Sequence, residues 1–281
     1  MKIESFPYKK GFTHGGKFHA DDVFATALLK YINPEFTVMR GFDIPDHFDG
    51  IVYDIGRGAF DHHQEDKEVR ENGVPYAAFG LVWRAFGPQL VGEEEAKRFD
   101  RTFIENLDLS DNTGSKSELA DVIDDFNPGW DSEEDRDEAF DRAVDFALVI
   151  LKNRFRAIEG FERAKEIVDQ AIADSNGGEL VVLPRYAPWK DRMVHSNALL
   201  CVYPSTRGGY GVQGVPVAEG SLELRAELPK ELRGKEPEEL QKLTGIETIT
   251  FVHASGFMGS TKTLEDALKL AELTLEKRSN S

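Results

Sequence analysis

The sequence predicts an α/β protein with a mostly parallel sheet in its N-terminal part, and two patterns support this. Two short runs, FTVMR and GIVYDIG, have the β-branched and aromatic content of strands and are separated by Gly and Pro. Ahead of them, apolar residues recur at the spacing of a helix that packs on one face, at Phe24, Ala27, Leu28 and Tyr31. Strands that alternate with helices are typical of a parallel sheet, whose ligands gather at the carboxyl ends of its strands.

The segment KGFTHGGKFH, residues 10–19, is interpreted as a strand end and a loop that lead into the helix beginning near Asp21. His14 lies at this strand end, Asp54 lies in the last predicted strand, and the DHH triplet at 61–63 follows shortly after it. We therefore expect these side chains to emerge at one edge of the sheet.

A long helix is expected in the middle of the chain. It follows the acidic stretch NPGWDSEEDRDEAF, which we interpret as a solvated helix start rather than a functional acidic patch, because acidic residues favour the first turn of a helix. The helix continues weakly past Gly160, which either kinks or splits it, to the SNGG at 175–178. Its apolar positions recur at helical spacing: Phe140, Val144, Leu148, Leu151, Phe155 and Ile158.

The C-terminal part reads as a second, smaller α/β domain. Its strand-like runs are ELVVLP, ALLCVYP, YGVQGVP and TITFVHA, and a final helix begins near Thr263. The stretch RGGYGVQG is interpreted as a hairpin turn, with base stacking by Tyr210 as the alternative. The apolar positions of the final helix are Leu264, Leu268, Ala271 and Leu275.

The composition argues against several classes of protein. No apolar run approaches the length of a membrane span, and the N-terminal MKIESFPYKK lacks the features of a secretory or transit signal, so we expect a cytoplasmic protein with no membrane partner. Cys201 is the sole cysteine, so any metal must be bound by His, Asp or Glu. The formal charge of −17 argues against broad electrostatic attraction to nucleic acid, although bound cations would reduce it locally.

The sequence contains a concentration of oxygen and imidazole ligands, which suit Mn²⁺, Mg²⁺, Fe²⁺ or Zn²⁺. Two carboxylates about 4 Å apart repel by roughly 4 kcal/mol at an effective dielectric of 20, so such a cluster needs cations, protons or strong donors. Each residue alone has a structural explanation, such as a loop hydrogen bond, a helix cap or a turn. The set consists of His14, His19, Asp21, Asp22, Asp54, Asp61, His62, His63, Asp108 and Asp111.

Other histidines and motifs point away from function. His47 and His195 stand in polar segments without a strand-end carboxylate, so we interpret both as surface or hydrogen-bonding residues. No P-loop, dinucleotide fingerprint or nucleophile elbow is present, which leaves kinase, dehydrogenase and serine hydrolase functions without support.

Seven segments in order resemble one family: THGGKFHADD, VYDIG, FDHHQ, DLSDN, FNPGW, APWK and FVHASGFMGS. The chain resembles the DHH phosphoesterase superfamily and, more closely, the MYG (melanocyte proliferating gene) family of 3′-to-5′ RNA exonucleases or metal-dependent hydrolases. The resemblance implies a DHH-type catalytic domain over 1–133, a helical connector over 134–178 and a substrate-binding domain over 179–281. It differs at YAAFG, where that family tends to carry serines near a helix start.

The resemblance also implies two divalent ions, typically Mn²⁺, with Mg²⁺ or another divalent ion as the alternative. His14 and His19 would bind the first ion, Asp21 the second, and Asp54 both. His62 would complete the ligands of the second ion together with Asp108 or Asp111, of which Asp108 is slightly preferred. The catalytic set would be His63 at the substrate phosphate, Asp61 orienting a histidine, and Asp22.

The implied substrate-binding residues lie in the second domain. HASGFMGSTKT is expected to be a Gly- and Ser-rich loop before a helix, where backbone N–H groups favour a phosphate, with an ordinary capped loop as the alternative. The candidates are His253, Ser255, Gly256, Gly259, Ser260, Lys262, Arg225 and Arg185, with Lys190 and Arg207 as further cations.

Three functions compete. The first is a two-metal phosphodiesterase that trims RNA or short oligonucleotides from the 3′ end with a hydroxide held between the ions. The second is a small-molecule phosphohydrolase acting on pyrophosphate, a cyclic dinucleotide or a phosphoadenosine phosphate, which the charge of −17 favours. The third is a metal-stabilised binding protein without turnover. A homodimer is left open.

Overall fold

The computed structural model describes residue 3 and residues 6–279 of the chain. Contacts divide the described chain between Ile158 and Glu159 into two compact units. The division falls within the segment expected to connect two domains. Each unit contains its own sheet, which confirms the predicted α/β class.

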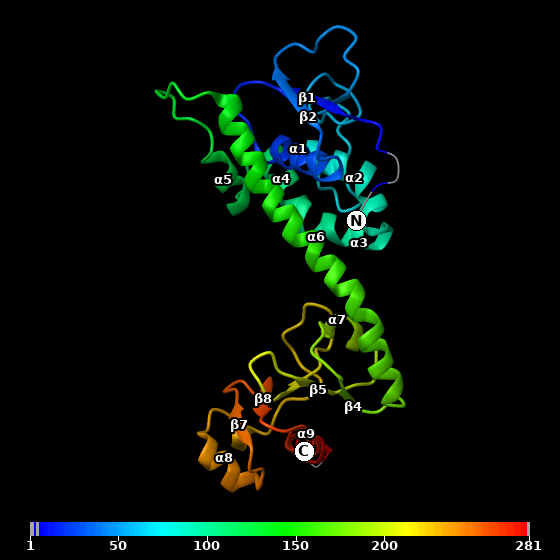
Figure 1. Ribbon diagram of the computed structural model, residues 1–281, viewed down its shortest axis with the longest axis vertical. Coiled ribbons are helices and arrows are strands. Elements are labelled where there is room, and N and C mark those ends of the chain that lie inside the picture. Colours follow the sequence, from blue (N-terminus) through cyan, green and yellow to red (C-terminus); the bar gives the residue numbers. More distant parts are fainter. Residues whose placement is uncertain (1–2, 4–5, 280–281) are drawn as a thin grey trace. The chain divides into compact units, whose positions relative to one another are not determined.

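The first unit is built on a three-stranded parallel sheet in the order β2-β1-β3 (Figure 1). The strands are β1 (Lys10–His14), β2 (Thr37–Gly41) and β3 (Ile51–Val52), and α1 (Ala20–Ile32) connects the first two. The predicted strands and the first helix are thus confirmed. A side chain at Gly11 would meet the Phe36 ring at 2.6 Å, so the central strand needs glycine where this aromatic ring packs.

Helices bury the core of the first unit. They are α2 (Ala78–Val91), α3 (Glu93–Phe99), the π-helical turn η1 (Asp100–Ile104), α4 (Glu105–Thr113), α5 (Glu118–Asp124) and α6 (Arg136–Asp174). Aromatic side chains join them: Phe24 of α1 stacks on Phe79 of α2 at 5.4 Å between ring centroids, and Trp83 stacks on Phe155 of α6 at 5.9 Å. This packing holds α1 and α4, the two helices that carry candidate ligands, in one core.

The long helix α6 runs without interruption through Gly160. Asp135 precedes it, and the Asp135 carboxylate accepts hydrogen bonds from the backbone N–H groups of Asp137 and Glu138 at 2.7 and 3.3 Å. The acidic stretch therefore starts the helix, as predicted. Gly160 does not split α6 into two helices, because glycine costs only about 1 kcal/mol relative to alanine in a helix interior.

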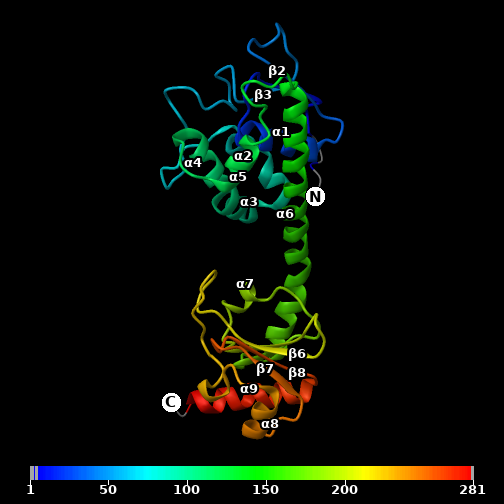
Figure 2. The same ribbon diagram turned by 90° about the vertical axis from the view of Figure 1, so that its left-hand side faces the viewer.

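The second unit contains a five-stranded sheet in the order β4-β5-β6-β8-β7, in which only β4 and β5 are parallel (Figure 2). The strands are β4 (Leu180–Val182), β5 (Leu200–Pro204), β6 (Tyr210–Gly214), β7 (Ile249–Val252) and β8 (Met258–Thr261). The helices are α7 (Lys190–Met193), the 3₁₀ turn η2 (Lys230–Leu232), α8 (Pro237–Thr244) and α9 (Leu264–Ser279). Helix α9 packs on β5, β6 and β8 through Ala267, Leu270 and Ala271. The predicted inward face was therefore right only in part, because Leu264 is exposed and Leu268 and Leu275 are half-buried.

Two hairpins define the local structure of the second sheet. Pro204 pairs with Tyr210 across an antiparallel hairpin, which confirms the interpretation of RGGYGVQG. The expectation of a loop directly before a helix at HASGFMGSTKT was wrong in part. Gly259 and Ser260 lie inside strand β8, which pairs with β6 and β7, so only the preceding turn and the residues after β8 are loops.

No helix in the described part of the chain combines the length and the apolarity that crossing a bilayer requires.

Candidate metal centre

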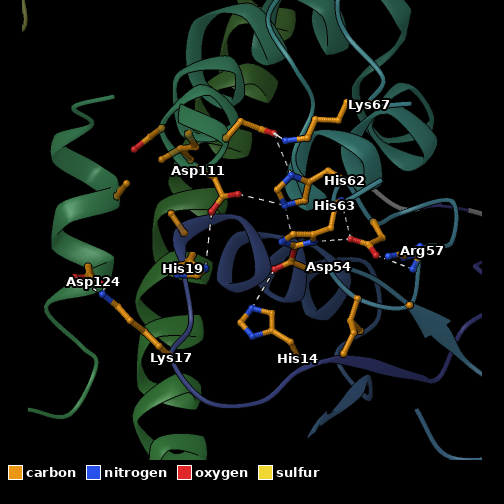
Figure 3. Close-up of a pocket in the computed structure, with 18 of the residues that line it drawn as sticks. His14, Lys17, His19, Asp54, Arg57, His62, His63, Lys67, Asp111 and Asp124 are labelled. Carbon is orange, nitrogen blue, oxygen red and sulfur yellow. Dashed lines mark hydrogen bonds and ion pairs between the residues drawn. The ribbon is translucent and has the colours of Figure 1, made fainter. Parts of the chain in front are cut away.

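Two strand ends and two helices bring histidines and aspartates to one pocket of about 780 Å³ in the first unit (Figure 3). β1 ends at His14, and Asp54 follows β3. The loop after Asp54 turns back and places His62 and His63 in the same pocket, while α4 supplies Asp111. The pocket therefore collects side chains from distant parts of the sequence at the carboxyl edge of the sheet.

His14 forms one group with two carboxylates. Its Nε2 lies 3.1 Å from Asp54 Oδ2 and 3.3 Å from Asp22 Oδ2. Asp22 is fully buried, and its other carboxylate oxygen accepts a hydrogen bond from the His19 backbone N–H at 3.0 Å. The structure thus places Asp22 beside His14, whereas the ring centroid of His19 is 5.8 Å from that of His14.

His62 is the centre of a second group. Its Nε2 lies 3.1 Å from Asp54 Oδ1, 3.2 Å from Asp111 Oδ2 and 3.6 Å from Asp21 Oδ2. His19 reaches the same group from its edge, with Nδ1 3.9 Å from Asp111 Oδ1. The two oxygens of Asp54 therefore face different histidines, as a carboxylate shared between two cations requires.

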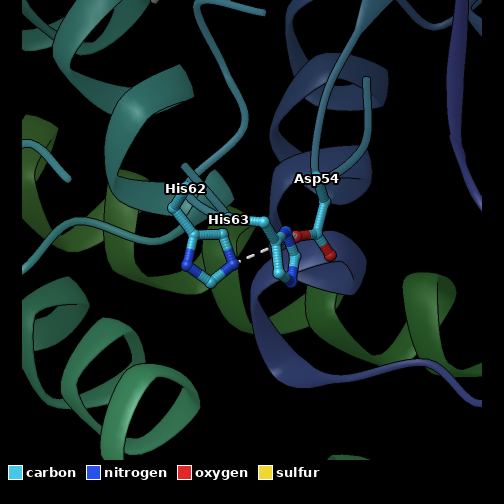
Figure 4. Close-up of side chains that lie close together, drawn as sticks. All are labelled: Asp54, His62 and His63. Carbon is cyan, nitrogen blue, oxygen red and sulfur yellow. Dashed lines mark hydrogen bonds and ion pairs between the residues drawn. The ribbon is translucent and has the colours of Figure 1, made fainter. Parts of the chain in front are cut away.

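His63 lies beside His62 and Asp54 (Figure 4) and, like His19, is an exposed member of the cluster. Its ring centroid is 4.3 Å from that of His62, and its Nδ1 lies 2.7 Å from Asp61 Oδ1 and 3.7 Å from Asp54 Oδ1. The hydrogen bond to Asp61 uses Nδ1 and leaves Nε2 for other partners. The side chain of His63 is 61% exposed, whereas that of Asp61 is 2% exposed, so Asp61 anchors a ring that solvent and substrate can reach.

Without a cation, burial and mutual repulsion disfavour the charged form of the Asp21 carboxylate in the cluster. Burial and the neighbouring carboxylates, Asp54 first, raise the pKa of Asp21 well above its ordinary value. Burial would lower the pKa of His14, but Asp54 and Asp22 outweigh burial and raise it to about 9. Burial would raise the pKa of Asp54, but hydrogen bonds from His14 and His62 lower it to about 2. The histidines thus take the role of cations toward Asp54.

Two buried oxygens favour a bound cation. Asp21 Oδ1 and Asp22 Oδ2 are buried and have no hydrogen-bond partner. Ligand atoms about 2.1 Å from one cation lie roughly 3–4 Å from one another, and the contacts of His14 and His62 with the carboxylates of the cluster fall at 3.1–3.6 Å. The described side chains thus form groups that can bind a metal ion, and their oxygen and imidazole atoms fit Mn²⁺ or a similar divalent ion.

Asp54 adopts a left-handed backbone conformation, with a φ of 56°. This conformation costs a residue with a side chain about 1 kcal/mol or more, although aspartate tolerates it better than most. The Asp54 N–H donates to the carbonyl oxygen of Phe60 at 3.0 Å, which closes the loop that leads back to the DHH triplet. Strain of this kind is retained at the residue that contacts both histidine groups.

Comparison with known proteins identifies the family. The family model MYG1_exonuc, described as "Uncharacterised protein family (UPF0160)", matches residues 11–275, which includes nearly all of both units. The chain belongs to the MYG1 family. The MYG resemblance predicted from the ordered motifs is thereby confirmed.

The relatives span almost the whole chain. The protein named MYG1 exonuclease of Homo sapiens is 30% identical and covers 95% of this chain and 86% of its own length. The MYG1 protein of Saccharomyces cerevisiae is 26% identical and covers 98% of both chains. The protein of Rattus norvegicus named MYG1 exonuclease is 30% identical over 95% of this chain and 84% of its own length. No solved structure gives a significant match.

In this MYG1-family chain, Asp108 does not face the histidines. Asp108 is fully buried, and its carboxylate lies 2.7 Å from Arg70 Nη2 and accepts a hydrogen bond from the Gly80 N–H at 3.2 Å. Arg70 is in turn paired with Asp100. Of the two competing aspartates, the structure brings Asp111 to the cluster. Both lie on α4.

The start of α2 has alanines at YAAFG, where the family tends to carry serines near a helix start. Ala77, the N-cap residue, makes no side-chain cap hydrogen bond. Instead the backbone N–H of Ala78 donates to Asp21 Oδ2 at 3.2 Å. The positive end of the helix therefore stabilises the carboxylate of a candidate ligand.

Asn112 is a residue of the site that sequence reasoning missed. Its Oδ1 lies 3.2 Å from Nδ1 of His62 and accepts a hydrogen bond from Lys67 at 3.1 Å. Its Nδ2 donates to the carbonyl oxygens of Tyr76 and Asp108. An amide oxygen at Nδ1 favours the His62 tautomer that carries its proton on Nδ1, which leaves Nε2 able to bind a cation. The only sequence signal was its place in DLSDN beside Asp111.

We predict that Asn112→Ala weakens Mn²⁺ binding by about 10–100-fold, because the His62 ring loses the partner that orients it. Isothermal titration with Mn²⁺ measures this affinity. Asn106→Ala, on the exposed side of the same helix, is the matched control and should bind as the wild type does. Equal affinities for Asn112→Ala and the control would show that Asn112 does not orient the ligand.

The second unit places its candidate residues in different settings. The His253 ring contacts Ser255 Oγ at 2.8 Å in the turn between β7 and β8, beside Gly256. Arg225 is committed to the fold, since its guanidinium donates to the carbonyl oxygens of Val194, Ser196 and Ala198.

The remaining candidates of the second unit divide by their contacts. Ser260 Oγ is paired with Thr250, and Gly259 packs where a side chain would meet Leu228 at 2.8 Å. Lys262 and Arg185 are exposed, and Arg185 lines a pocket of about 620 Å³ within this unit.

His47 and His195 lie as the sequence indicated. His47 is exposed in its loop, and His195 is exposed with Nε2 3.3 Å from Glu219 Oε1. Neither lines the pocket of the metal centre.

Proposed function

We propose that this protein is a metal-dependent phosphodiesterase that removes nucleotides from the 3′ end of RNA or of short oligonucleotides. The observation that carries the proposal is the convergence of histidines and buried aspartates on Asp54, whose two oxygens face two histidine groups. The names of the human and rat relatives, MYG1 exonuclease, support the same class of reaction.

We assign the ligands from the geometry. His14, Asp22 and Asp54 would hold one cation. His62, Asp54, Asp111 and Asp21 would hold the other, with His19 at the edge of this group. His63 also lies within ligand distance of Asp54 and His62, and we assign it to the substrate instead because it is exposed. This assignment differs from the one implied by the family resemblance, which paired His14 with His19. Manganese is the expected metal. When bound, such cations lower the pKa of water and neutralise the charge that develops on phosphate oxygens.

The protein's own residues supply orientation and a mobile proton. His63 is exposed at the mouth of the pocket, and Asp61 holds its Nδ1, so Nε2 can donate a hydrogen bond or a proton to a phosphate oxygen. Hydrolysis of the terminal phosphodiester would release a 5′-nucleotide and leave a strand shortened by one residue.

We assign substrate binding to the second unit through the residues that the fold leaves available. His253, Ser255, Gly256, Lys262 and Arg185 lie in turns or on the exposed surface. Ser260, Gly259 and Arg225 have structural partners and contribute through the fold that presents the others.

The test is turnover of 5′-labelled oligoribonucleotides by the purified protein with Mn²⁺. The expected result is a ladder of products shortened one nucleotide at a time, which EDTA abolishes and added Mn²⁺ restores. Intact oligonucleotides in the presence of Mn²⁺ would refute the proposal. Parallel assays with pyrophosphate, a cyclic dinucleotide and 3′-phosphoadenosine phosphate, read by phosphate or mononucleotide release, separate a nuclease from a small-molecule phosphohydrolase.

A further inference from the structure

We propose that Arg57 and Lys67 form a subsite for the phosphate group adjacent to the reacting one in a nucleic-acid substrate. The inference rests on the proposed phosphodiesterase function and adds to it the part of the first unit that the strand crosses. Neither residue stands in any motif of the metal centre.

Arg57 and Lys67 line the same two pockets. Arg57 and Lys67 both line the pocket of the metal centre, and both line a smaller adjoining pocket of about 310 Å³ together with Asp61 and His62. Figure 3 shows Arg57 beyond His63 and Lys67 beside His62, both away from Lys17 and Asp124. A substrate phosphate that extends from the metal centre past His63 would therefore meet them next.

Their charges are not neutralised by the protein. Within the described part of the chain, neither the Arg57 guanidinium nor the Lys67 ammonium group has a carboxylate partner, and the one side-chain contact of Lys67 is with the neutral oxygen of Asn112. The chain has 51 acidic residues against 34 basic ones, so carboxylates are abundant. Lys17, which lines the same pocket, is paired with Asp124 at 2.8 Å. The smaller pocket also contains Asp66 and Glu68, of which Glu68 is paired with Arg84. Arg57 and Lys67 thus remain available to an anion because no described carboxylate pairs with them.

The fold links Arg57 to His63 and Lys67 to His62. The Asp61 carboxylate accepts hydrogen bonds from the Arg57 backbone N–H at 2.6 Å and from the His63 ring at 2.7 Å. Arg57 is kept in a left-handed conformation, with a φ of 58°, which costs an arginine about 1 kcal/mol or more. Asn112 connects Lys67 to His62 in the same way. Movement of either cation is therefore linked to the side chains at the reacting phosphate.

The chemistry of the pair fits a phosphodiester. Arginine presents planar paired donors that match two phosphate oxygens, and lysine adds a point charge with three donors, of which Asn112 takes one. A substrate with one phosphate would occupy only the metal centre, whereas an oligonucleotide would also reach this pair. The subsite thus distinguishes a chain of nucleotides from a small phosphate ester.

The experiment compares two substrates on the Mn²⁺-loaded full chain. One is a short oligoribonucleotide, and the other is bis(p-nitrophenyl) phosphate, which carries a single phosphate. For the Arg57→Ala/Lys67→Ala variant we expect kcat/KM on the oligoribonucleotide to fall by about 10–100-fold, mainly through KM, with a weaker salt dependence. On the single-phosphate diester we expect a change of less than about threefold. The single variant Arg57→Lys should show a smaller loss than the double variant, because the positive charge at position 57 is retained.

Controls and outcomes keep the inference separate from the proposed function. Lys97→Ala removes a cation paired with Glu94 on α3 and should change neither substrate's kinetics. Mn²⁺ content and circular dichroism verify that the variants are folded and loaded. Equal losses on both substrates, or no loss on the oligoribonucleotide, would overturn the subsite. Wild-type protein that hydrolyses neither substrate would overturn the proposed function and the subsite with it.

Discussion

The Asp54→Asn variant is expected to lose at least one Mn²⁺ ion per chain and about three orders of magnitude or more in kcat/KM. Asp54 is the residue whose two oxygens contact His14 and His62 at 3.1 Å each. An amide has the same shape, but it has no charge and only one oxygen to share. Asparagine also adopts left-handed backbone conformations readily, so the φ of 56° at this position survives the change.

Metal content by inductively coupled plasma mass spectrometry and rates on oligoribonucleotides measure the effect. Asp49→Asn, an exposed position in the same unit, is the control for the loss of one charge. The wild type should also gain thermal stability from Mn²⁺, because a ligand that binds the folded state stabilises it, and the variant should gain less. A variant that keeps two ions and normal turnover would show that Asp54 is not the shared ligand.

The His63→Ala variant is expected to lose about 10²–10⁴-fold in kcat while it keeps its full Mn²⁺ content. His63 is 61% exposed and bonded to Asp61, and the proposed ligand sets are complete without it. Its loss should therefore remove a donor from the substrate phosphate and leave the cations in place. Single-turnover rates together with metal analysis test this separation.

The same variant distinguishes an enzyme from a binding protein. A metal-stabilised protein without turnover has no rate that His63→Ala could lower, so any biochemical activity would be equal in the variant and the wild type. Asp61→Asn should give a smaller loss of the same kind, because the amide would hold the His63 ring in position only in part. His195→Ala, which removes an exposed histidine paired with Glu219, is the control.

Part of the formal charge of −17 is concentrated in the cluster of the metal centre. Asp21, Asp22 and Asp54 are buried within one cluster, where two bound divalent ions would offset much of their charge. The cations Arg57 and Lys67 lie at the rim of the same pocket. Bound ions would therefore reduce the negative charge that the proposed substrate meets at this pocket.

Much of the first unit could be predicted from short patterns. The parallel sheet, the helix over Ala20–Ile32 and the long helix α6 follow from the periodicity of apolar residues, which reports which face of an element is buried. The motifs at the strand ends could be placed at one edge because parallel strands direct their carboxyl ends the same way. The hairpin β7–β8 was misjudged at Gly259 and Ser260, since strand pairing with β6 overrides the turn tendency of Gly and Ser.

By itself the sequence determined the fold class, the family and the set of residue types that can bind a cation, because these depend on local order along the chain. Only the tertiary structure decided which members of that set meet. Asp108 and Asp111 are one helical turn apart on α4, yet one pairs with Arg70 and the other with His62. Which partner an aspartate meets depends on groups 38 and 49 positions away along the chain, and no local pattern encodes that distance.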